Sequence, residues 1–324
     1  MSRITLKIYA LLLLFPICLV TVKQDGICSS RPTKQFLLSA NGALKVSVVA
    51  PASGCENQVV EKLSAYKDLK MSPLLNVLGA SPFHSNTDDN RASDLIAALH
   101  DHQKYIWALR GGYGSAKLIP YLSPSDLPNN KVIIGYSDIT ALHLFVNKHG
   151  LKSIHGANLN ELLYTKDKDP MNFVILKDVM LGKRKKLRYQ NIKPLNKNAK
   201  NAVINASLIG GNLELITNSI GTIWQIDTKD KIVFIEDVGI KGYALDRSLN
   251  HLIQAGLLED IKAILFGTFQ NGDEFVEFVI KKFADKIDIP VYASDQFGHG
   301  YKNYPLIFGT KAKIASGELL IDCS

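Results

Sequence analysis

The 324-residue chain has few cysteines, and it lacks repeats, low-complexity runs and any second long apolar run. The absence of repeats and biased segments excludes solenoid, collagen-like and disordered classes of protein. The four cysteines, at positions 18, 28, 55 and 323, do not have the spacing of a zinc ribbon or finger. Hydrophobic residues make up 46% of the chain and charged residues 21%, which is the balance of a globular protein. A chain of this length predicts about two domains of ordinary size.

The first 29 residues have the pattern of a secretory signal followed by a short tail. Arg3 and Lys7 precede an apolar run over 8–22. This run is short for a transmembrane helix, which needs ~20 residues. The alternatives are a buried helix and, through Cys18 or Cys28, a lipoprotein anchor. We expect an exported protein of the periplasm or cell envelope, with no membrane span left once the signal is cleaved.

The chain is basic, with a net charge of +8 and a pI of about 9.1. Such a charge suits nucleic acid, an anionic membrane or an acidic polymer, and the lysines are spread too widely to choose among them. One basic cluster covers 183–188, with Tyr189 as its single aromatic neighbour. Nucleic-acid sites interleave stacking residues with cations, so we expect a solvated segment here and no nucleic-acid partner.

Strands alternate with helices over 30–165, which predicts an N-terminal α/β domain built on a parallel sheet. The expected strands are 44–50, 105–109 and 131–134, and the expected helices are 92–102, 139–146 and one beginning near 118. Functional residues of such domains gather at the carboxyl ends of the strands.

Charges and two prolines dominate 166–200, which favours a linker. A smaller, β-rich C-terminal domain is then expected over 201–324. Its expected strands are 206–209, 231–235 and 263–267, its expected helices are 212–220 and 244–255, and short strands fill 289–321.

Ser137 lies at a sharp turn between an expected strand and helix. Such a turn lifts a serine hydroxyl clear of the sheet and directs free helix N–H groups at a bound group, as a nucleophile requires. The alternative is that Ser137 or Asp138 caps the helix. Gly111 and Gly112 also follow a buried strand, where paired glycines form either a tight turn or a close approach to a ligand.

Glu236 and His299 are the candidate partners of Ser137. Glu236 ends an apolar strand and is either a surface charge or a group that orients a histidine. His299 lies in a glycine-flanked loop and is either solvated or a base. The chain order Ser137, Glu236, His299 is the nucleophile–acid–base order of one class of hydrolase triads. His100 and His102 do not share a helix face, and H-E-x-x-H is absent, so we expect no metal and no cofactor.

Eight stretches carry a more specific pattern, and they run in order from about residue 44 to the C-terminus. They are 49–51, 91–95, 108–114, 135–140, 155–156, 210–213, 235–237 and 297–299. In this combination the chain resembles the LD-carboxypeptidase family of serine peptidases, which includes the microcin-immunity hydrolases. The pair R-G-G-Y-G at 110–114 and G-Y-S-D-I-T at 135–140 is the most specific part. Lys117 stands where the family usually has Arg.

The resemblance implies a site as well as a fold. It implies a triad of Ser137, Glu236 and His299 and an oxyanion hole formed by N–H groups of Asp138 and of Gly112 or Gly111. It also implies substrate contacts from three further residues, which are Asn212, Gly211 and Tyr113.

The resemblance further implies the substrate. Family members release D-Ala from the L-centre of the third residue of peptidoglycan stem tetrapeptides, and many form homodimers. Two alternatives stay open. One is hydrolysis of an aminoacyl-nucleotide antibiotic, which would need a stacking aromatic where 157–170 offers only Tyr164. The other is a noncatalytic muropeptide-binding protein.

Overall fold

A computed structural model describes residues 44–75, 81–163 and 167–323, and the expected signal and tail at 1–29 lie outside these ranges. Within the described ranges, no helix is both long and apolar enough to cross a membrane.

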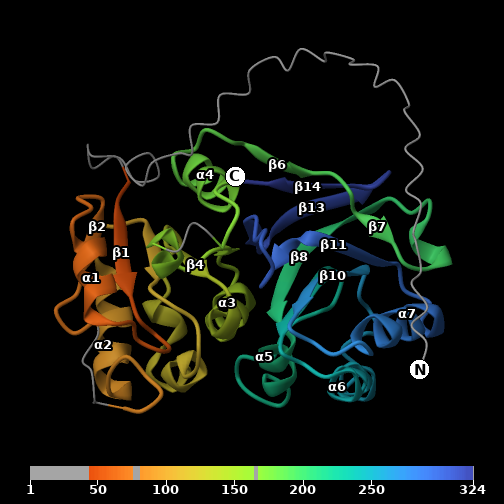
Figure 1. The fold of residues 1–324 in the computed structure, drawn as a ribbon, viewed down its shortest axis with the longest axis horizontal. Coiled ribbons are helices and arrows are strands. Elements are labelled where there is room, and N and C mark those ends of the chain that lie inside the picture. Colours follow the sequence, from red (N-terminus) through yellow and green to blue (C-terminus); the bar gives the residue numbers. More distant parts are fainter. Residues whose placement is uncertain (1–43, 76–80, 164–166, 324) are drawn as a thin grey trace, which may run out of the picture. The chain divides into compact units, whose positions relative to one another are not determined.

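The first sheet has six strands in the order β12-β5-β4-β3-β1-β2. Its strands β1, β2 and β4 are labelled in the left half of Figure 1. Five strands are parallel, and β12, from the C-terminal end of the chain, pairs antiparallel with β5. Helices and 3-10 turns connect the parallel strands, as a parallel sheet requires. The elements are β1 (Val46–Val49), α1 (Asn57–Ser64), β2 (Leu69–Met71), α2 (Asp88–His100), β3 (Tyr105–Ala108), η2 (Ser115–Tyr121), η3 (Pro124–Asp126), β4 (Val132–Gly135), η4 (Ser137–Ile139), α3 (Thr140–Lys148), β5 (Ser153–His155), η5 (Leu159–Leu163) and β12 (Leu306–Phe308).

The second sheet has eight strands in the order β6-β14-β13-β8-β9-β10-β11-β7. Its centre, from β8 to β11, is parallel, and the outer strands are antiparallel. The elements are α4 (Met171–Met180), β6 (Lys186–Tyr189), β7 (Lys193–Pro194), η6 (Lys197–Ala199), β8 (Ile204–Asn212), α5 (Leu213–Asn218), β9 (Lys231–Val238), α6 (Gly242–Gln254), β10 (Ala263–Gln270), α7 (Val276–Lys286), β11 (Val291–Gly298), β13 (Thr310–Ala315) and β14 (Glu318–Asp322).

The predicted α/β fold class, with a parallel N-terminal sheet and a β-rich C-terminal part, is confirmed. The C-terminal sheet has eight strands and the N-terminal sheet has six, and the smaller size expected for the C-terminal domain stays a prediction. The segment 166–200, expected as a linker, contains α4, β6 and β7. Its position as a domain boundary stays a prediction.

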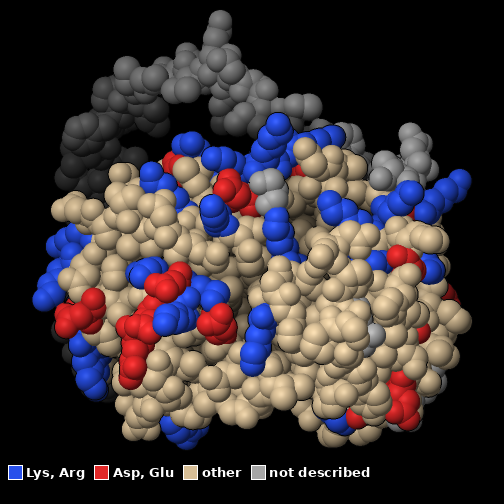
Figure 2. All heavy atoms as spheres, turned by 180° about the vertical axis from the view of Figure 1, so that it is seen from behind, with Lys and Arg blue, Asp and Glu red and all other residues tan. Residues whose placement is uncertain are grey.

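The basic cluster at 183–188 lies on β6 and just before it. Several of its cations have acidic partners: Arg184 pairs with Asp178 at 3.1 Å, and Arg188 pairs with Glu318 at 2.8 Å. Figure 2 shows Lys and Arg along the upper edge of one face and interspersed with Asp and Glu in its middle. The net positive charge is therefore not gathered into one patch on this face.

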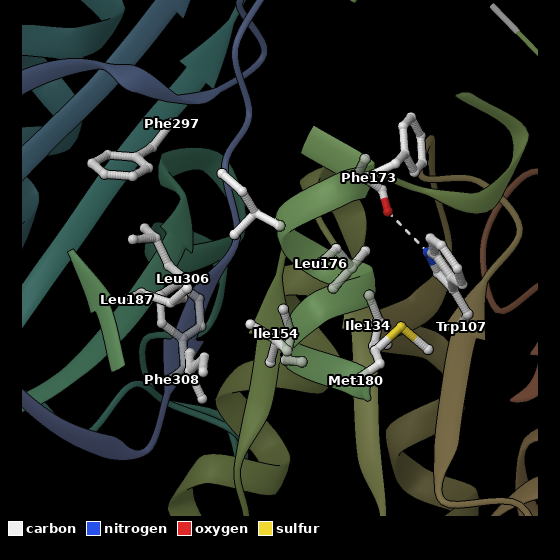
Figure 3. Packing of buried hydrophobic residues seen from close by; sticks show 14 of the residues in the cluster. Trp107, Ile134, Ile154, Phe173, Leu176, Met180, Leu187, Phe297, Leu306 and Phe308 are labelled. Atoms are coloured by element: carbon white, nitrogen blue, oxygen red, sulfur yellow. Dashed lines mark hydrogen bonds between the residues drawn. The ribbon is translucent and has the colours of Figure 1, made fainter. Parts of the chain in front are cut away.

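One apolar core runs from the first sheet into the second (Figure 3). Trp107 of β3 and Phe173 of α4 belong to it, as do Phe308 of β12 and Phe297 of β11. The Trp107 indole N–H donates to the Ala157 carbonyl at 2.9 Å, which satisfies its polar group inside the core. Helix α4 and the edge strand β12 thus contribute apolar side chains to a core that both sheets share.

Candidate active site

Ser137 occupies a strained turn at the carboxyl end of β4. Its φ is +64°, in the left-handed region that serine rarely adopts. The positions that cap η4 and α3 are Tyr136 and Ile139, and neither helix has a side-chain capping hydrogen bond. The capping interpretation of Ser137 and Asp138 is therefore wrong. Strain of about 1–3 kcal/mol at such a residue is typical of functional sites.

The glycine loop lies directly against this turn. A Cβ at Gly111 would come within 2.9 Å of the Ser137 Cβ, so the close approach requires glycine here. Gly112 has a φ of +109°. The Asp138 carboxylate accepts the N–H groups of Gly114 at 3.3 Å and Ser115 at 2.7 Å, which ties the loop to the turn. The predicted oxyanion-hole residues, Gly111, Gly112 and Asp138, therefore surround Ser137.

Glu236 and His299 meet across an irregularity in the second sheet. Glu236 lies on β9, His299 follows β11, and β10 runs between these two strands. The register of β10 shifts after Phe266 against both neighbours. Because of this shift, His299 Nδ1 lies 2.5 Å from Glu236 Oε2. Bulges are frequent next to active sites because they redirect side chains in this way.

Thr268, just beyond the bulge, holds the His299 loop in place. Its hydroxyl donates to the Phe297 carbonyl and accepts the Gly300 N–H, both at 3.1 Å. The two bonds fix the backbone on either side of His299. No sequence pattern indicated this role, because Thr268 follows an apolar strand pattern.

The electrostatics of the pair favour a charged imidazole. Glu236 is fully buried, and its Oε1 has no hydrogen-bond partner among the described residues. Burial lowers the pKa of His299, but the charge and hydrogen bond of Glu236 outweigh burial and raise the pKa above its usual value. Burial, and next the charge of Glu236, raise the pKa of the adjacent Asp237 to about 7. The His299 Nδ1 is thus committed to Glu236, which leaves Nε2 for proton transfer.

A cavity of about 420 Å³ brings the predicted residues together. Ser137, His299, Gly111 and Gly112 all line it. The ring of His299 lies on that of Tyr136, the residue before Ser137, with centroids 4.7 Å apart. The structure therefore places the nucleophile and base candidates at one cavity, and Glu236 contacts His299 from the buried interior.

Further residues of this cavity were not predicted, namely Arg110, Tyr136, Asn158, Asn160, Glu161, Asp167 and Lys168. The Lys168 ammonium donates to the carbonyls of His299 at 3.3 Å and Gly300 at 3.0 Å. Burial raises the pKa of Glu161, and this effect outweighs the opposing charge of Lys168. Asn158 and Glu161 follow β5, so the rule that sites gather at the carboxyl ends of strands could have found them.

The three predicted substrate contacts have different positions. Asn212 is buried, accepts the Leu215 N–H at 3.4 Å as the cap of α5, and donates its own N–H to the Thr140 hydroxyl at 2.9 Å. A Cβ at Gly211 would come within 2.4 Å of that hydroxyl. Both residues thus join β8 to α3, next to the site. Tyr113 is exposed and lines a neighbouring cavity. Contact of all three with substrate stays a prediction.

The absence of a metal site stays a prediction from the sequence. Over the described ranges, no group of three or more His, Cys, Asp or Glu side chains is arranged to hold a metal ion.

Comparisons with known proteins agree with this geometry. Family models for the LD-carboxypeptidase N-terminal domain and C-terminal domain match residues 46–156 and 205–314. A Rickettsia conorii protein that carries a carboxypeptidase name is 45% identical over 289 residues, covering 86% of this chain and 91% of that protein. The murein tetrapeptide carboxypeptidase of Pseudomonas aeruginosa is 27% identical over 296 residues, covering 85% of this chain and 94% of that protein.

A solved structure shares the fold. The microcin C7 self-immunity protein in complex with aspartyl sulfamoyl adenosine matches with a TM-score of 0.74 at 20% identity, covering 86% of this chain and 96% of that one. With both of its domain models matched and a 45% identical relative, this chain belongs to the LD-carboxypeptidase family of peptidases.

Proposed function

We propose that the chain is a serine-type LD-carboxypeptidase that releases the terminal D-Ala from the L-centre of the third residue of peptidoglycan stem tetrapeptides. The observation that carries this proposal is Ser137, held at a φ of +64° on the cavity that His299, the partner of Glu236, also lines. A strained serine beside an oriented histidine is the arrangement of an activated nucleophile.

The proposed reaction begins when His299 Nε2 takes the proton of Ser137 Oγ as this oxygen attacks the scissile carbonyl. Glu236 holds the imidazole through Nδ1 and stabilises the imidazolium that forms. The N–H groups of Asp138 and of Gly112 or Gly111 bind the oxyanion. His299 then gives the proton to the departing D-Ala amine, and water hydrolyses the acyl-enzyme by the same route in reverse.

A carboxypeptidase must also recognise the free carboxylate of its substrate. Arg110 and Lys168 are the two cations that line the cavity. Lys168 is held by two backbone carbonyls, and Arg110 donates to the Gly54 carbonyl at 3.2 Å. Arginine pairs with carboxylates through two parallel hydrogen bonds, so we assign the D-Ala carboxylate to Arg110.

The 27% identical murein tetrapeptide carboxypeptidase supports the choice of substrate. The immunity-type alternative rests on likeness in fold, and its one candidate aromatic, Tyr164, lies outside the described residues. Competition between tetrapeptide and an aminoacyl-adenylate analogue separates these functions. A noncatalytic muropeptide-binding protein would instead show affinity without turnover, unchanged in His299→Ala.

We also propose that the protein acts in the cell envelope, because the basic and apolar pattern of 1–29 is that of an exported chain. Fractionation of cells that express the full chain tests this location. The homodimer expected from the family resemblance is tested by light scattering on the purified protein.

The mechanism is tested by mass spectrometry of products from purified tetrapeptide. Wild-type protein should release D-Ala and leave the tripeptide, and Ser137→Ala should lower kcat by several orders of magnitude. Ser123→Ala, at an exposed position away from the cavity, is the matched control and should retain full activity. D-Ala release by Ser137→Ala at the wild-type rate would rule out the serine mechanism.

A further inference from the structure

A second cavity, of about 700 Å³, adjoins the catalytic cavity. Arg110 lines both, so the two cavities lie next to this side chain. The second cavity has two large aromatic side chains, Phe83 and Tyr113, which are 63% and 55% exposed. Exposed aromatic side chains that gather in a hollow mark a surface for a ligand.

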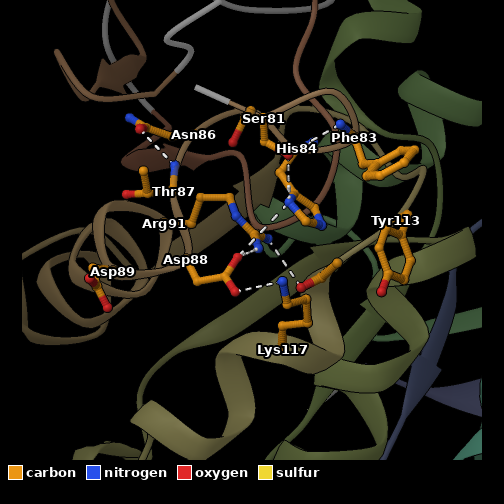
Figure 4. Close-up of polar contacts among 12 residues, drawn as sticks. Ser81, Phe83, His84, Asn86, Thr87, Asp88, Asp89, Arg91, Tyr113 and Lys117 are labelled. Carbon is orange, nitrogen blue, oxygen red and sulfur yellow. Dashed lines mark hydrogen bonds and ion pairs between the residues drawn. The ribbon is translucent and has the colours of Figure 1, made fainter. Parts of the chain in front are cut away.

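The two rings form a fixed platform. Their centroids are 6.2 Å apart at an angle of 86°, and His84 stacks beneath Tyr113 at 5.2 Å and 30°. Figure 4 shows Phe83 and Tyr113 side by side, on the same side of His84. His84 thus covers one face of the Tyr113 ring, and the remaining surface of the ring is exposed.

Polar bonds hold the two aromatic loops together. The Ser53 hydroxyl donates to the Phe83 carbonyl at 2.7 Å and accepts the Tyr113 N–H at 3.3 Å. A Cβ at Gly112 would lie 2.2 Å from that hydroxyl, so this contact requires the glycine. One serine therefore links the backbones that carry the two rings.

An ion network supports the platform from behind (Figure 4). Asp88 pairs with Arg91 at 2.5 Å and with Lys117 at 2.7 Å, and Arg91 donates to the Gly114 carbonyl at 3.1 Å. The network joins the first turn of α2 to the glycine loop and to η2. Lys117, which departs from the family pattern, makes an ion pair here.

We propose that this cavity, the Phe83–Tyr113 subsite, binds the amino-sugar ring to which the stem peptide is attached; the inference rests on the proposed function. The apolar C–H face of a pyranose packs on an aromatic ring, and the exposed side chains of Glu56 and Gln58 line the same cavity to bond its hydroxyl and acetamido groups.

The reach of the substrate fits the spacing of the two cavities. Three peptide residues separate the scissile carbonyl from the sugar, a span of at most ~10 Å at about 3.3–3.6 Å per residue. Gly111 abuts Ser137, and Tyr113 follows it by two residues, at most ~7 Å along the chain. The backbone of Tyr113 therefore lies no farther from Gly111 than the stem peptide can span.

The experiment compares kcat/KM for muramoyl tetrapeptide and for the same tetrapeptide without sugar. Wild-type protein should prefer the muramoyl substrate by about tenfold, the size of one stacking contact. Phe83→Ala and Tyr113→Ala should reduce that ratio toward one. Phe278→Ala and Tyr243→Ala, which remove aromatic residues 64% and 71% exposed on α7 and α6, should leave it unchanged.

Three results overturn the proposal: equal kcat/KM for both substrates in wild-type protein, an equal loss on both substrates in the variants, or a changed oligomeric state with an unchanged ratio. The first two leave the proposed function intact. If neither substrate is cut, the proposed function fails, and calorimetry with a muramoyl dipeptide, which has the sugar but no scissile bond, decides the subsite. Binding that Phe83→Ala weakens supports the subsite, and unaltered or absent binding refutes it.

Discussion

His299 is the residue whose titration should control the rate. It must be neutral to act as a base, and its pKa is raised above 6.5 because the attraction of Glu236 outweighs the opposing effect of burial. We expect kcat/KM to rise with pH through one ionisation above 6.5. The same shift stabilises the folded protein fully below pH 6.5, and this contribution is lost as pH rises through the raised pKa.

Glu236→Gln removes the charge and keeps the shape. Burial and the charge of Lys168 then lower the pKa of His299 against the weaker attraction of Asp237, so the ionisation should move to lower pH while the maximal rate falls. Glu277→Gln, at an exposed position on α7, is the control and should leave the profile in place. The pH profile of kcat/KM measures both variants, and an unmoved ionisation in Glu236→Gln would contradict the assigned pair.

The strained backbone of Ser137 lowers the stability of the folded protein, and its role as nucleophile explains why the strain is kept. At a φ of +64°, an alanine keeps the strain and a glycine relieves it. We expect both Ser137→Ala and Ser137→Gly to be inactive, with the glycine variant more stable by about 1 kcal/mol. Thermal unfolding measures the difference, which amounts to about 2–4 °C for chains near this size. A glycine variant no more stable than the alanine variant would show that the turn is unstrained.

At the scale of the element, the bulge in β10 is what assembles the acid and the base. Thr268→Val removes the two hydrogen bonds that fix the His299 loop, and Thr268→Ser keeps the hydroxyl. We expect the valine variant to lose about tenfold or more in kcat, with KM little changed, because the loop positions His299 and not the substrate. The serine variant should recover most of the rate. Equal rates in the two variants would assign Thr268 a packing role alone.

Apolar runs predicted the central strands well, because their residues are buried on both faces. β4, expected over 131–134, spans Val132–Gly135, and β9 begins at the expected Lys231. β8 was expected to end at 209, since Gly210 and Gly211 suggested a turn. The strand continues to Asn212, and a Cβ at Gly210 would lie 1.9 Å from the Phe234 carbonyl oxygen. Close packing, which sequence does not show, explains these glycines.

Other elements and contacts were missed. α7 was not predicted, although Val276, Val279 and Phe283 recur at helical spacing and are buried. The three triad candidates were predicted from the order of their motifs. The contact between Glu236 and His299 spans the β10 bulge, which no local sequence pattern indicates. The Phe83–Tyr113 platform joins two loops through Ser53, a residue far from Phe83 in sequence, so only the fold could reveal it.

At the scale of the whole molecule, the site draws Ser137 from the first sheet and Glu236 and His299 from the second. All described residues fall within one compact unit that extends over Pro32–Ser324. β12 pairs with β5. The ring centroid of Phe308 on β12 lies 5.7 Å from that of His143 and 6.3 Å from that of Phe234. Since one apolar core runs through both sheets, catalysis and folding should depend on the same contacts.

The two tryptophans allow this coupling to be measured, because Trp107 lies on β3 of the first sheet and Trp224 lies between α5 and β9. In Trp224→Phe, the fluorescence of Trp107 reports the unfolding of the first sheet. In Trp107→Phe, the fluorescence of Trp224 reports the unfolding of the second. We expect the urea midpoint of the fluorescence change to equal the urea midpoint of the activity loss in both variants, because the sheets unfold together. Phe308→Ala, which opens the shared core at a cost of about 3–5 kcal/mol, should lower both midpoints equally. Separate midpoints, with activity following the lower one, would mean that the sheets fold independently and that the site forms by docking.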